Sequence, residues 1–288
     1  MTEPIESPAA EKRKAPAPSQ RFKRRATLLK APAEIWRARM LVRALAEREL
    51  RALYKQAVLG VAWSVLTPVA LMLVFTIFFQ RVATIDTHGV PYSLFVYIGL
   101  IAWNFFSASL STGGMSLVNQ MHLVNKLKCP REVFPLAYMF VAAFNTVIAG
   151  LVLLVLFAVN GFAPKITSPV AILPLIVQLA FTLGVTLIVA SVTVYLRDLR
   201  HALPILLQLG LLATPIAYGL DQIPENLQPL YSAVNPLGPV IDSYRATILY
   251  GTMPNWSLLG IGAVSSFVFL IAGIKLFRRL ELGFADVA

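Results

Sequence analysis

Six long apolar segments constrain this chain more than any other feature of its sequence. They cover approximately residues 62–80, 92–112, 134–159, 170–194, 202–219 and 256–277. A run of about 20 apolar residues matches the thickness of a bilayer core, where a helix satisfies its own backbone hydrogen bonds. The composition agrees, because 57% of the residues are hydrophobic and 14% are charged, against about 25% charged in soluble domains. The sequence therefore predicts an all-α integral membrane protein with six transmembrane helices.

Lysine and arginine residues gather on one side of the six predicted spans. They are concentrated before residue 56 and at residues 126–131, 197–200 and 275–279. The opposite side carries Arg81, Lys165 and Arg245. Because basic loops tend to remain in the cytoplasm, both termini are predicted to be cytoplasmic. The same uneven placement argues against nucleic-acid binding as the reason for the net charge of +11.

The chain before the first span is expected to have two parts. Residues 1–33 are rich in Pro, Ala, Lys and Arg without apolar periodicity, which predicts a disordered basic cytoplasmic arm. Residues 34–60 predict an amphipathic helix in the membrane interface, followed by a pivot at Leu59 and Gly60. Its apolar face carries Val42, Leu45, Ala46, Leu50 and Leu53, and its charged face carries Arg43, Glu47, Arg51 and Lys55.

Residues 220–250 are too apolar for an aqueous loop and too rich in proline for a span. Prolines occur at positions 224, 229, 236 and 239. We expect a re-entrant helical hairpin on the outer face, with its backbone buried against protein. Its candidate outer-gate residues are Tyr231, Asn235, Pro236 and Tyr244. Asp242 and Arg245, three residues apart, are expected to pair on a helix surface.

Several function classes require residues that this sequence lacks. Cys129 is the single cysteine, and the three histidines do not have the spacing of a metal site. No Walker A motif occurs, and the predicted spans lack the carboxylates or histidines that relay protons. No cofactor is expected in this chain. Active transport would need a separate ATPase subunit that binds ATP and Mg.

Four segments follow one another along the chain at positions that suit this topology. They are residues 51–63 (RALYKQAVLGVAW), 99–106 (GLIAWNFF), 123–135 (LVNKLKCPREVFP) and 235–245 (NPLGPVIDSYR). In this order they resemble the ABC-2-type permeases that export O-antigens, capsules, teichoic acids or galactan. The resemblance runs from about residue 40 to the end, and makes 61–288 the six-span transmembrane domain. The basic arm is not part of the family pattern.

The resemblance implies two contact sites on the cytoplasmic side. A coupling helix at about 119–133 would dock on the ATPase, through His122, Lys126, Lys128, Pro130, Arg131 and Glu132. A polyprenyl-diphosphate-linked polysaccharide would enter beside the interface helix, at Arg51, Tyr54, Lys55, Leu59 and Gly60. A simpler interpretation is that these cations contact the phosphates of ordinary membrane lipids.

Aromatic residues are concentrated in the first two predicted spans. Candidates for the lining of a glycan channel are Phe75, Phe78, Phe79, Tyr97, Trp103 and Phe106. Flat apolar rings would let sugar rings slide without tight hydrogen bonds. Trp103 lies near mid-span, where its indole N–H needs a polar partner or faces a pore. Core packing is the alternative role for each of these rings.

The favoured hypothesis is the permease subunit of an ABC exporter of lipid-linked polysaccharide, of the O-antigen or galactan type, in a bacterial plasma (inner) membrane. The chain would act as a homodimer with two ATPase subunits and would not itself be an enzyme. An exporter of a small drug or lipid is the alternative in the same architecture. A membrane-embedded transferase would need clustered carboxylates, and a passive channel would need a charge ring or filter motif. The sequence shows neither feature.

Overall fold

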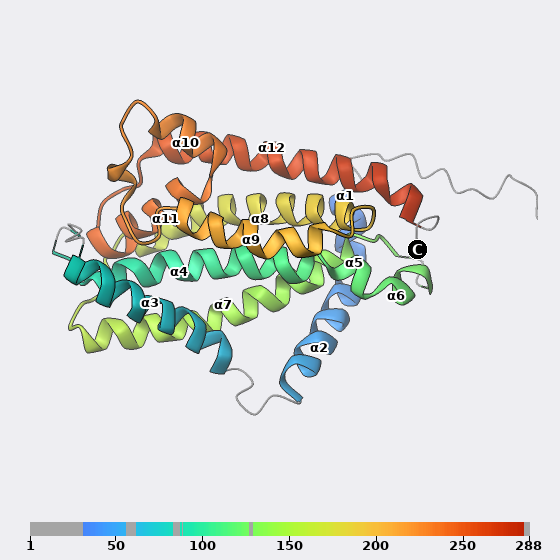
Figure 1. Ribbon diagram of the computed structural model, residues 1–288, viewed down its shortest axis with the longest axis horizontal. Helices are drawn as coiled ribbons and strands as arrows, with labels where there is room; N and C mark the ends of the chain where they lie inside the picture. The colour runs from blue at the N-terminus through green and yellow to red at the C-terminus, as the bar shows by residue number, and fades with distance from the viewer. Residues whose placement is uncertain (1–30, 56–61, 83–86, 88, 127–128, 285–288) are drawn as a thin grey trace, which may run out of the picture.

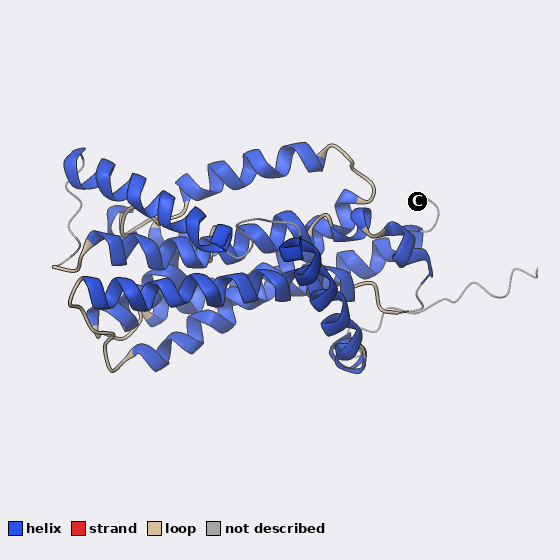
Figure 2. Ribbon diagram, turned by 90° about the horizontal axis from the view of Figure 1, so that it is seen from below, coloured by secondary structure: helices blue, strands red, loops and turns tan. Residues whose placement is uncertain are grey.

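The computed structural model describes residues 31–55, 62–82, 87, 89–126 and 129–284, and these residues form helices without any strand (Figures 1 and 2). The α-helices are α1 (Ala31–Arg37), α2 (Arg39–Lys55), α3 (Ala62–Val82), α4 (Tyr92–Ala108), α5 (Ser116–Asn119), α6 (Met121–Lys126), α7 (Val133–Val159), α8 (Ile172–Thr193), α9 (Leu199–Ala213), α10 (Gln228–Val234), α11 (Leu237–Arg245) and α12 (Trp256–Leu280). The short helices are η3 (Ser109–Gly113), η4 (Ser168–Ala171), η5 (Leu220–Gln222), η6 (Ala246–Tyr250) and η7 (Glu281–Gly283).

An apolar helix lies at each of the six predicted spans. Among the described residues, four helices are long and apolar enough to cross a membrane: Tyr92–Gly113, Val133–Val159, Ser168–Thr193 and Trp256–Leu280. Two further apolar helices, Ala62–Phe78 and Leu199–Ala213, are shorter. The all-helical fold is therefore confirmed, and at least four of its helices have the length and composition of membrane spans.

The long helices form a bundle with two distinct ends (Figure 1). At one end, called here the α10–α11 end, two short helices occupy part of the region predicted to be a hairpin. Helix α10 packs on α12, and α11 packs on α4, α8 and α12. At the opposite end, called here the α6 end, lie α5, α6 and the C-terminal end of α12. Helices α1 and α2 run across the long axis of the bundle near this end.

The amphipathic helix before the first span is divided in two. Its expected range begins at residue 34, whereas the structure has α1 and α2 separated by a turn at Ala38. Val42 and Ala46 of α2 are buried against Val133, Ala137 and Val141 near the start of α7. The first turns of the predicted apolar face are thus covered by α7, whereas Leu53 near its end is 49% exposed. The pivot at residues 59 and 60 lies outside the described residues.

Local signals fix several helix ends. Asn255 precedes α12, and its side-chain oxygen accepts a hydrogen bond from the backbone N–H of Leu258 at 3.3 Å, as an N-cap residue does. Gly251 follows η6 with φ of +74°, a conformation that glycine adopts without strain. Such signals position α11 and α12 so that both contact α8.

Candidate functional site

The predicted coupling residues lie between α5 and α7, in residues 120–132, called here the coupling segment. The structure separates these residues into two groups. His122 and Lys126 lie on α6 with exposed side chains. Glu132 is 2% exposed, and Arg131 is partly buried beside it. The carbonyl of Pro130 accepts a hydrogen bond from the N–H of Val133, which starts α7. Lys128 lies outside the part of the chain that the structure describes.

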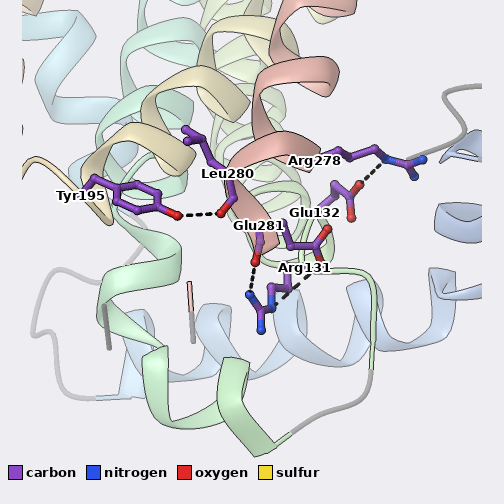
Figure 3. Close-up of polar contacts among 6 residues, drawn as sticks. All are labelled: Arg131, Glu132, Tyr195, Arg278, Leu280 and Glu281. Atoms are coloured by element: carbon purple, nitrogen blue, oxygen red, sulfur yellow. Dashed lines mark hydrogen bonds and ion pairs between the residues drawn. The ribbon is translucent and has the colours of Figure 1, made fainter. Parts of the chain in front are cut away.

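Arg131 and Glu132 bind the C-terminal end of α12 within the same chain (Figure 3). Arg131 Nη1 donates a hydrogen bond to the carbonyl oxygen of Glu281 at 2.7 Å, and its guanidinium carbon lies 5.5 Å from the Phe284 ring centroid. Arg278 Nε donates to Glu132 Oε1 at 3.0 Å. The coupling segment is therefore joined to α12 as well as to α7, with which it is continuous.

The charged face of α2 is exposed, as its sequence pattern predicts. Glu47 Oε1 accepts a hydrogen bond from Arg43 at 2.7 Å, and Glu47 Oε2 lies 3.8 Å from Arg51 Nη2. The hydrogen bond from Arg43 lowers the pKa of Glu47, and the charges of Arg43 and Arg51 add to this effect. Arg51 and Lys55 have exposed side chains. Both cations are therefore accessible to an anionic group outside the protein.

The predicted substrate-entry residues, called here the portal, include Tyr54, which contacts a long helix. Its hydroxyl donates a hydrogen bond to the side-chain oxygen of Asn145 on α7. Burial raises the pKa of the Tyr54 hydroxyl, which keeps it a donor. Sequence reasoning missed Asn145, although a lone amide within an apolar helix is a signal for such a partner. Leu59 and Gly60, the last two of the five substrate-entry candidates, lie outside the described residues.

The aromatic residues predicted to line a channel occupy different environments. On α4, Tyr97, Trp103 and Phe106 are buried in the main core. Tyr97 donates a hydrogen bond to the carbonyl of Ala149 at 3.0 Å, and Phe106 stacks on Phe181 with centroids 5.3 Å apart. In this structure these three rings pack between helices, because their spacing along α4 turns them toward apolar neighbours.

The remaining aromatic candidates belong to α3. Phe78 is 55% exposed, and Phe75 is partly buried against the main core. The side chain of Phe79 lies outside the described residues. Phe78 is thus the ring of this group that the structure presents on a surface.

The ring of Trp103 on α4 packs closely against Gly210 of α9. A Cβ atom on Gly210 of α9 would lie 2.8 Å from the edge of the Trp103 ring. Within the described residues the indole N–H has no hydrogen-bond partner, and Trp103 is 6% exposed. Of the two environments expected for it, a polar protein partner is therefore absent from this part of the structure.

A polar face on α4 and η3 was not recognised in the sequence. Asn104, Ser107 and Ser111 are partly exposed and Thr112 is exposed. Ser111 and Thr112 donate to carbonyls one turn earlier, at 2.6 and 2.7 Å, and their oxygens keep capacity to accept hydrogen bonds. The side-chain amide of Asn104 has no partner among the described residues. The signal was their spacing, since residues 104, 107 and 111 share one face of a helix.

At the α10–α11 end, two of the predicted gate residues join α10 to the end of α9. Tyr231 donates a hydrogen bond to the carbonyl of Ala213 at 2.8 Å. Asn235 Nδ2 donates to the Tyr231 hydroxyl and to Thr214 Oγ1, each at 2.9 Å. The short helix α10 is therefore tied to the α9 terminus by one side chain from its middle and one that follows its last residue.

The other two gate candidates belong to α11. Pro236 is buried immediately before this helix. Tyr244 donates to Gln178 Oε1 at 2.8 Å, and Gln178 Nε2 donates to the carbonyl of Ala102 at 2.8 Å. This chain of hydrogen bonds connects α11 through α8 to α4.

Arg245 has an environment that differs from the sequence expectation. It is 1% exposed, so the expected surface ion pair with Asp242 is wrong. Its guanidinium carbon lies 3.5 Å from the Phe95 ring centroid. Its nitrogens donate hydrogen bonds to the carbonyls of Phe95 at 3.1 Å, Pro215 at 2.9 Å, Ile216 at 2.6 Å and Tyr218 at 3.1 Å. Arg245 thus holds the non-helical segment after α9 against α4 and α11.

Comparison with known proteins supports one family. The family model described as ABC-2 type transporter matches residues 40–249. The O-antigen export system permease protein RfbA of Myxococcus xanthus is 33% identical over 256 residues, which cover 88% of this chain and 97% of that protein. A protein of the same name from Klebsiella pneumoniae is 28% identical over 84% of this chain and 93% of its own length.

A more distant relative has a related printed name. The polysialic acid transport protein KpsM of Escherichia coli is 25% identical over 84% of this chain and 94% of its own length. The matched family region includes α2, the coupling segment and both short helices of the α10–α11 end. The chain therefore belongs to the ABC-2 type transporter family.

Proposed function

We propose that this chain is the permease subunit of an ABC exporter that moves a lipid-linked polysaccharide, of the O-antigen or galactan type, outward across a bacterial plasma (inner) membrane. The observation that carries this proposal is the near full-length likeness to O-antigen export permeases. The name of the polysialic acid transport protein adds support for a polysaccharide substrate. The exposed cations Arg51 and Lys55 on α2 suit the diphosphate of a polyprenyl carrier.

The proposed topology has six spans, with both termini in the cytoplasm. Helices α3 and α9 would cross together with the four longer helices, and α10 and α11 would form a re-entrant hairpin from the outer face. The α6 end would then be cytoplasmic. Arg131 and Arg278 lie at this end, and a concentration of basic residues is expected on the cytoplasmic side.

Two kinds of protein partner complete the proposal. Two copies of a separate ATPase would bind ATP and Mg and dock at the α6 end, where His122 and Lys126 are exposed. A second copy of this chain would pack against α9. In this helix Leu203 is the buried residue, whereas Ile205, Leu206, Leu209 and Leu212 are exposed. An apolar surface of this extent suits either lipid or a protein neighbour.

The proposed substrate path runs from the α6 end to the α10–α11 end. The lipid diphosphate would bind beside α2, and the glycan would follow the polar face of α4 formed by Asn104, Ser107, Ser111 and Thr112. Hydroxyl and amide groups can form exchangeable hydrogen bonds with sugars, and the exposed ring of Phe78 offers an apolar surface. Helices α10 and α11 would form the outer gate.

Reconstitution with the ATPase in liposomes tests this function. We expect polyprenyl-diphosphate glycan to stimulate ATP hydrolysis, and the double variant Arg51→Ala/Lys55→Ala to lose this stimulation. The matched control is Arg197→Ala/Arg200→Ala, which removes two exposed cations from the start of α9 and its preceding turn. Stimulation by simple amphiphiles but not by the glycan would favour the drug or lipid exporter. Failure to associate with any ATPase would refute the ABC permease function.

A further inference from the structure

One guanidinium, that of Arg278, pairs with carboxylates from two distant segments. Arg278 Nε lies 3.0 Å from Glu132 Oε1, and Arg278 Nη2 lies 3.1 Å from Glu34 Oε2. Glu34 lies on α1 and Glu132 immediately precedes α7. Arg278 lies in the last turn of α12. The side chain therefore connects the N-terminal helix, the coupling segment and the last long helix at one point.

The geometry of this cluster requires arginine. A guanidinium presents several N–H donors in a fixed planar fork, so it can bind one carboxylate through Nε and another through a terminal nitrogen. A lysine ammonium is a single point charge and would not reproduce both directions. The position of residue 278 in the last turn of α12 also favours a cation, because the last helix carbonyls are unpaired.

The two carboxylates depend on Arg278 to different degrees. The side chain of Glu132 is 3% exposed and that of Glu34 is 25% exposed. A buried carboxylate without its cation is strongly destabilising, so Glu132 needs Arg278 for folding. Glu34 is partly exposed, so water reaches its carboxylate. The ion pair between Glu34 and Arg278 is therefore the part of the cluster that can be removed from a folded protein.

The ion pair of Glu34 is not required to attach the interface helix to the bundle. Val42 and Ala46 of α2 already pack on Val133, Ala137 and Val141 of α7, and this apolar contact does not involve α1. What Glu34 adds is a connection from α1, across the turn at Ala38, to the residues that lead into α7 and to α12. That connection joins the helix carrying the proposed portal to the proposed ATPase-docking segment.

We propose that Arg278 is a positioning residue that makes the interface helix and the coupling segment move together, so that substrate bound beside α2 is communicated to the ATPase. The inference rests on the proposed export function and deepens it. Lipid-linked glycan at α2 would shift α1, and the shared guanidinium would carry this shift to Glu132 and the coupling segment. Arg131 binds Glu281 next to this cluster and so attaches the end of α12 to the same coupling segment.

Two variants and one control test the link in the reconstituted complex. Glu34→Gln removes the negative charge of the more exposed carboxylate. Arg278→Lys keeps a cation for Glu132 but loses the guanidinium that binds both carboxylates at once. The control, Arg279→Lys, changes the neighbouring exposed arginine of α12 in the same way. The measurements are co-purification with the ATPase, basal ATP hydrolysis, and stimulation by polyprenyl-diphosphate glycan.

We expect both variants to assemble and hydrolyse ATP at the basal rate, while stimulation by the glycan falls about tenfold, a size typical of allosteric coupling. Arg279→Lys should retain native stimulation. Native stimulation in Glu34→Gln would overturn the inference. So would a uniform loss of assembly and basal activity in Arg278→Lys alone, because that pattern describes a fold contact. If the glycan fails to stimulate the unmodified complex, the proposed function is refuted. The inference that Arg278 communicates glycan binding to the ATPase is then rejected with it.

Discussion

Gly184 of α8 and Gly273 of α12 face each other with their backbones in contact. A Cβ atom on Gly273 would lie 2.4 Å from the carbonyl oxygen of Gly184, and one on Gly184 would lie 2.6 Å from the backbone nitrogen of Leu270. Small residues at a helix crossing permit this approach within a membrane. Helices α8 and α12 therefore form a closely packed pair. At the α6 end, α12 is bound to the coupling segment through Arg278 and Glu132.

Replacing Gly273 by alanine should destabilise this pair. The added methyl group must displace backbone, and overpacking of this kind costs about 1–3 kcal/mol. The control is Gly260→Ala on the same helix, where a Cβ would meet nothing within 4 Å. Thermal unfolding in detergent should show a lower melting temperature for Gly273→Ala and an equal or higher one for Gly260→Ala. Equal melting of the two variants would contradict the close contact.

The Tyr54–Asn145 hydrogen bond predicts a non-additive pair of substitutions. Tyr54→Phe leaves the Asn145 amide without its donor and should lower stability by about 1 kcal/mol. Replacing both partners, as in Tyr54→Phe/Asn145→Leu, removes the unpaired polar group and should recover part of this loss. Thermal melting of the two single variants and the double variant measures the interaction. Additive losses would argue against a direct bond between α2 and α7.

The carbonyl contacts of Arg245 predict that even a conservative change is harmful. Lysine has three donors at one point, whereas the guanidinium reaches four carbonyl oxygens from two segments. We expect Arg245→Lys to lower stability by on the order of 2 kcal/mol. Hydrogen exchange should become faster after residue 214, where the chain is not helical. Arg197→Lys, a change at an exposed position, is the control, and native behaviour of Arg245→Lys would contradict this role.

Cys129 provides a test that depends on pH. Burial raises the pKa of its thiol, and the charges of Glu281 and Glu132 raise it further, while Arg131 opposes them. Maleimides react with the thiolate, so labelling at neutral pH should be slower in the folded protein than after denaturation. The rate should increase as the pH rises above the ordinary pKa of a cysteine. Because Cys129 is the single cysteine, labelling reports this site alone.

Local patterns were sufficient to predict most of the helices. The lengths of the apolar segments located α4, α7, α8 and α12, because burial of backbone groups in a membrane leaves helices as the solution. The four-residue spacing of Arg43, Glu47, Arg51 and Lys55 predicted the exposed face of α2. Proline positions also indicated short helices after residue 220. Each of these signals lies within one turn or one span of the chain.

The partners of buried charges could not be predicted in the same way. The family resemblance implies that Arg131 and Glu132 contact the ATPase, but it gives no sign of their bonds within the chain to residues about 150 positions later. The spacing in sequence predicts Asp242 as the partner of Arg245, because it is a near neighbour on one helix face. Which carbonyl or carboxylate a guanidinium meets is decided by tertiary packing.

The contacts of Arg245 also suggest an order of assembly during synthesis. Phe95 and the carbonyls of residues 215–218 all precede Arg245 in the chain. A cation is costly within a bilayer, and chains form structure from the N-terminus as they leave the ribosome. The acceptors are thus already translated when Arg245 emerges, so the cation has a protein environment to enter. In the proposed re-entrant topology, an arginine placed ahead of its acceptors in the sequence would meet the membrane before they were translated.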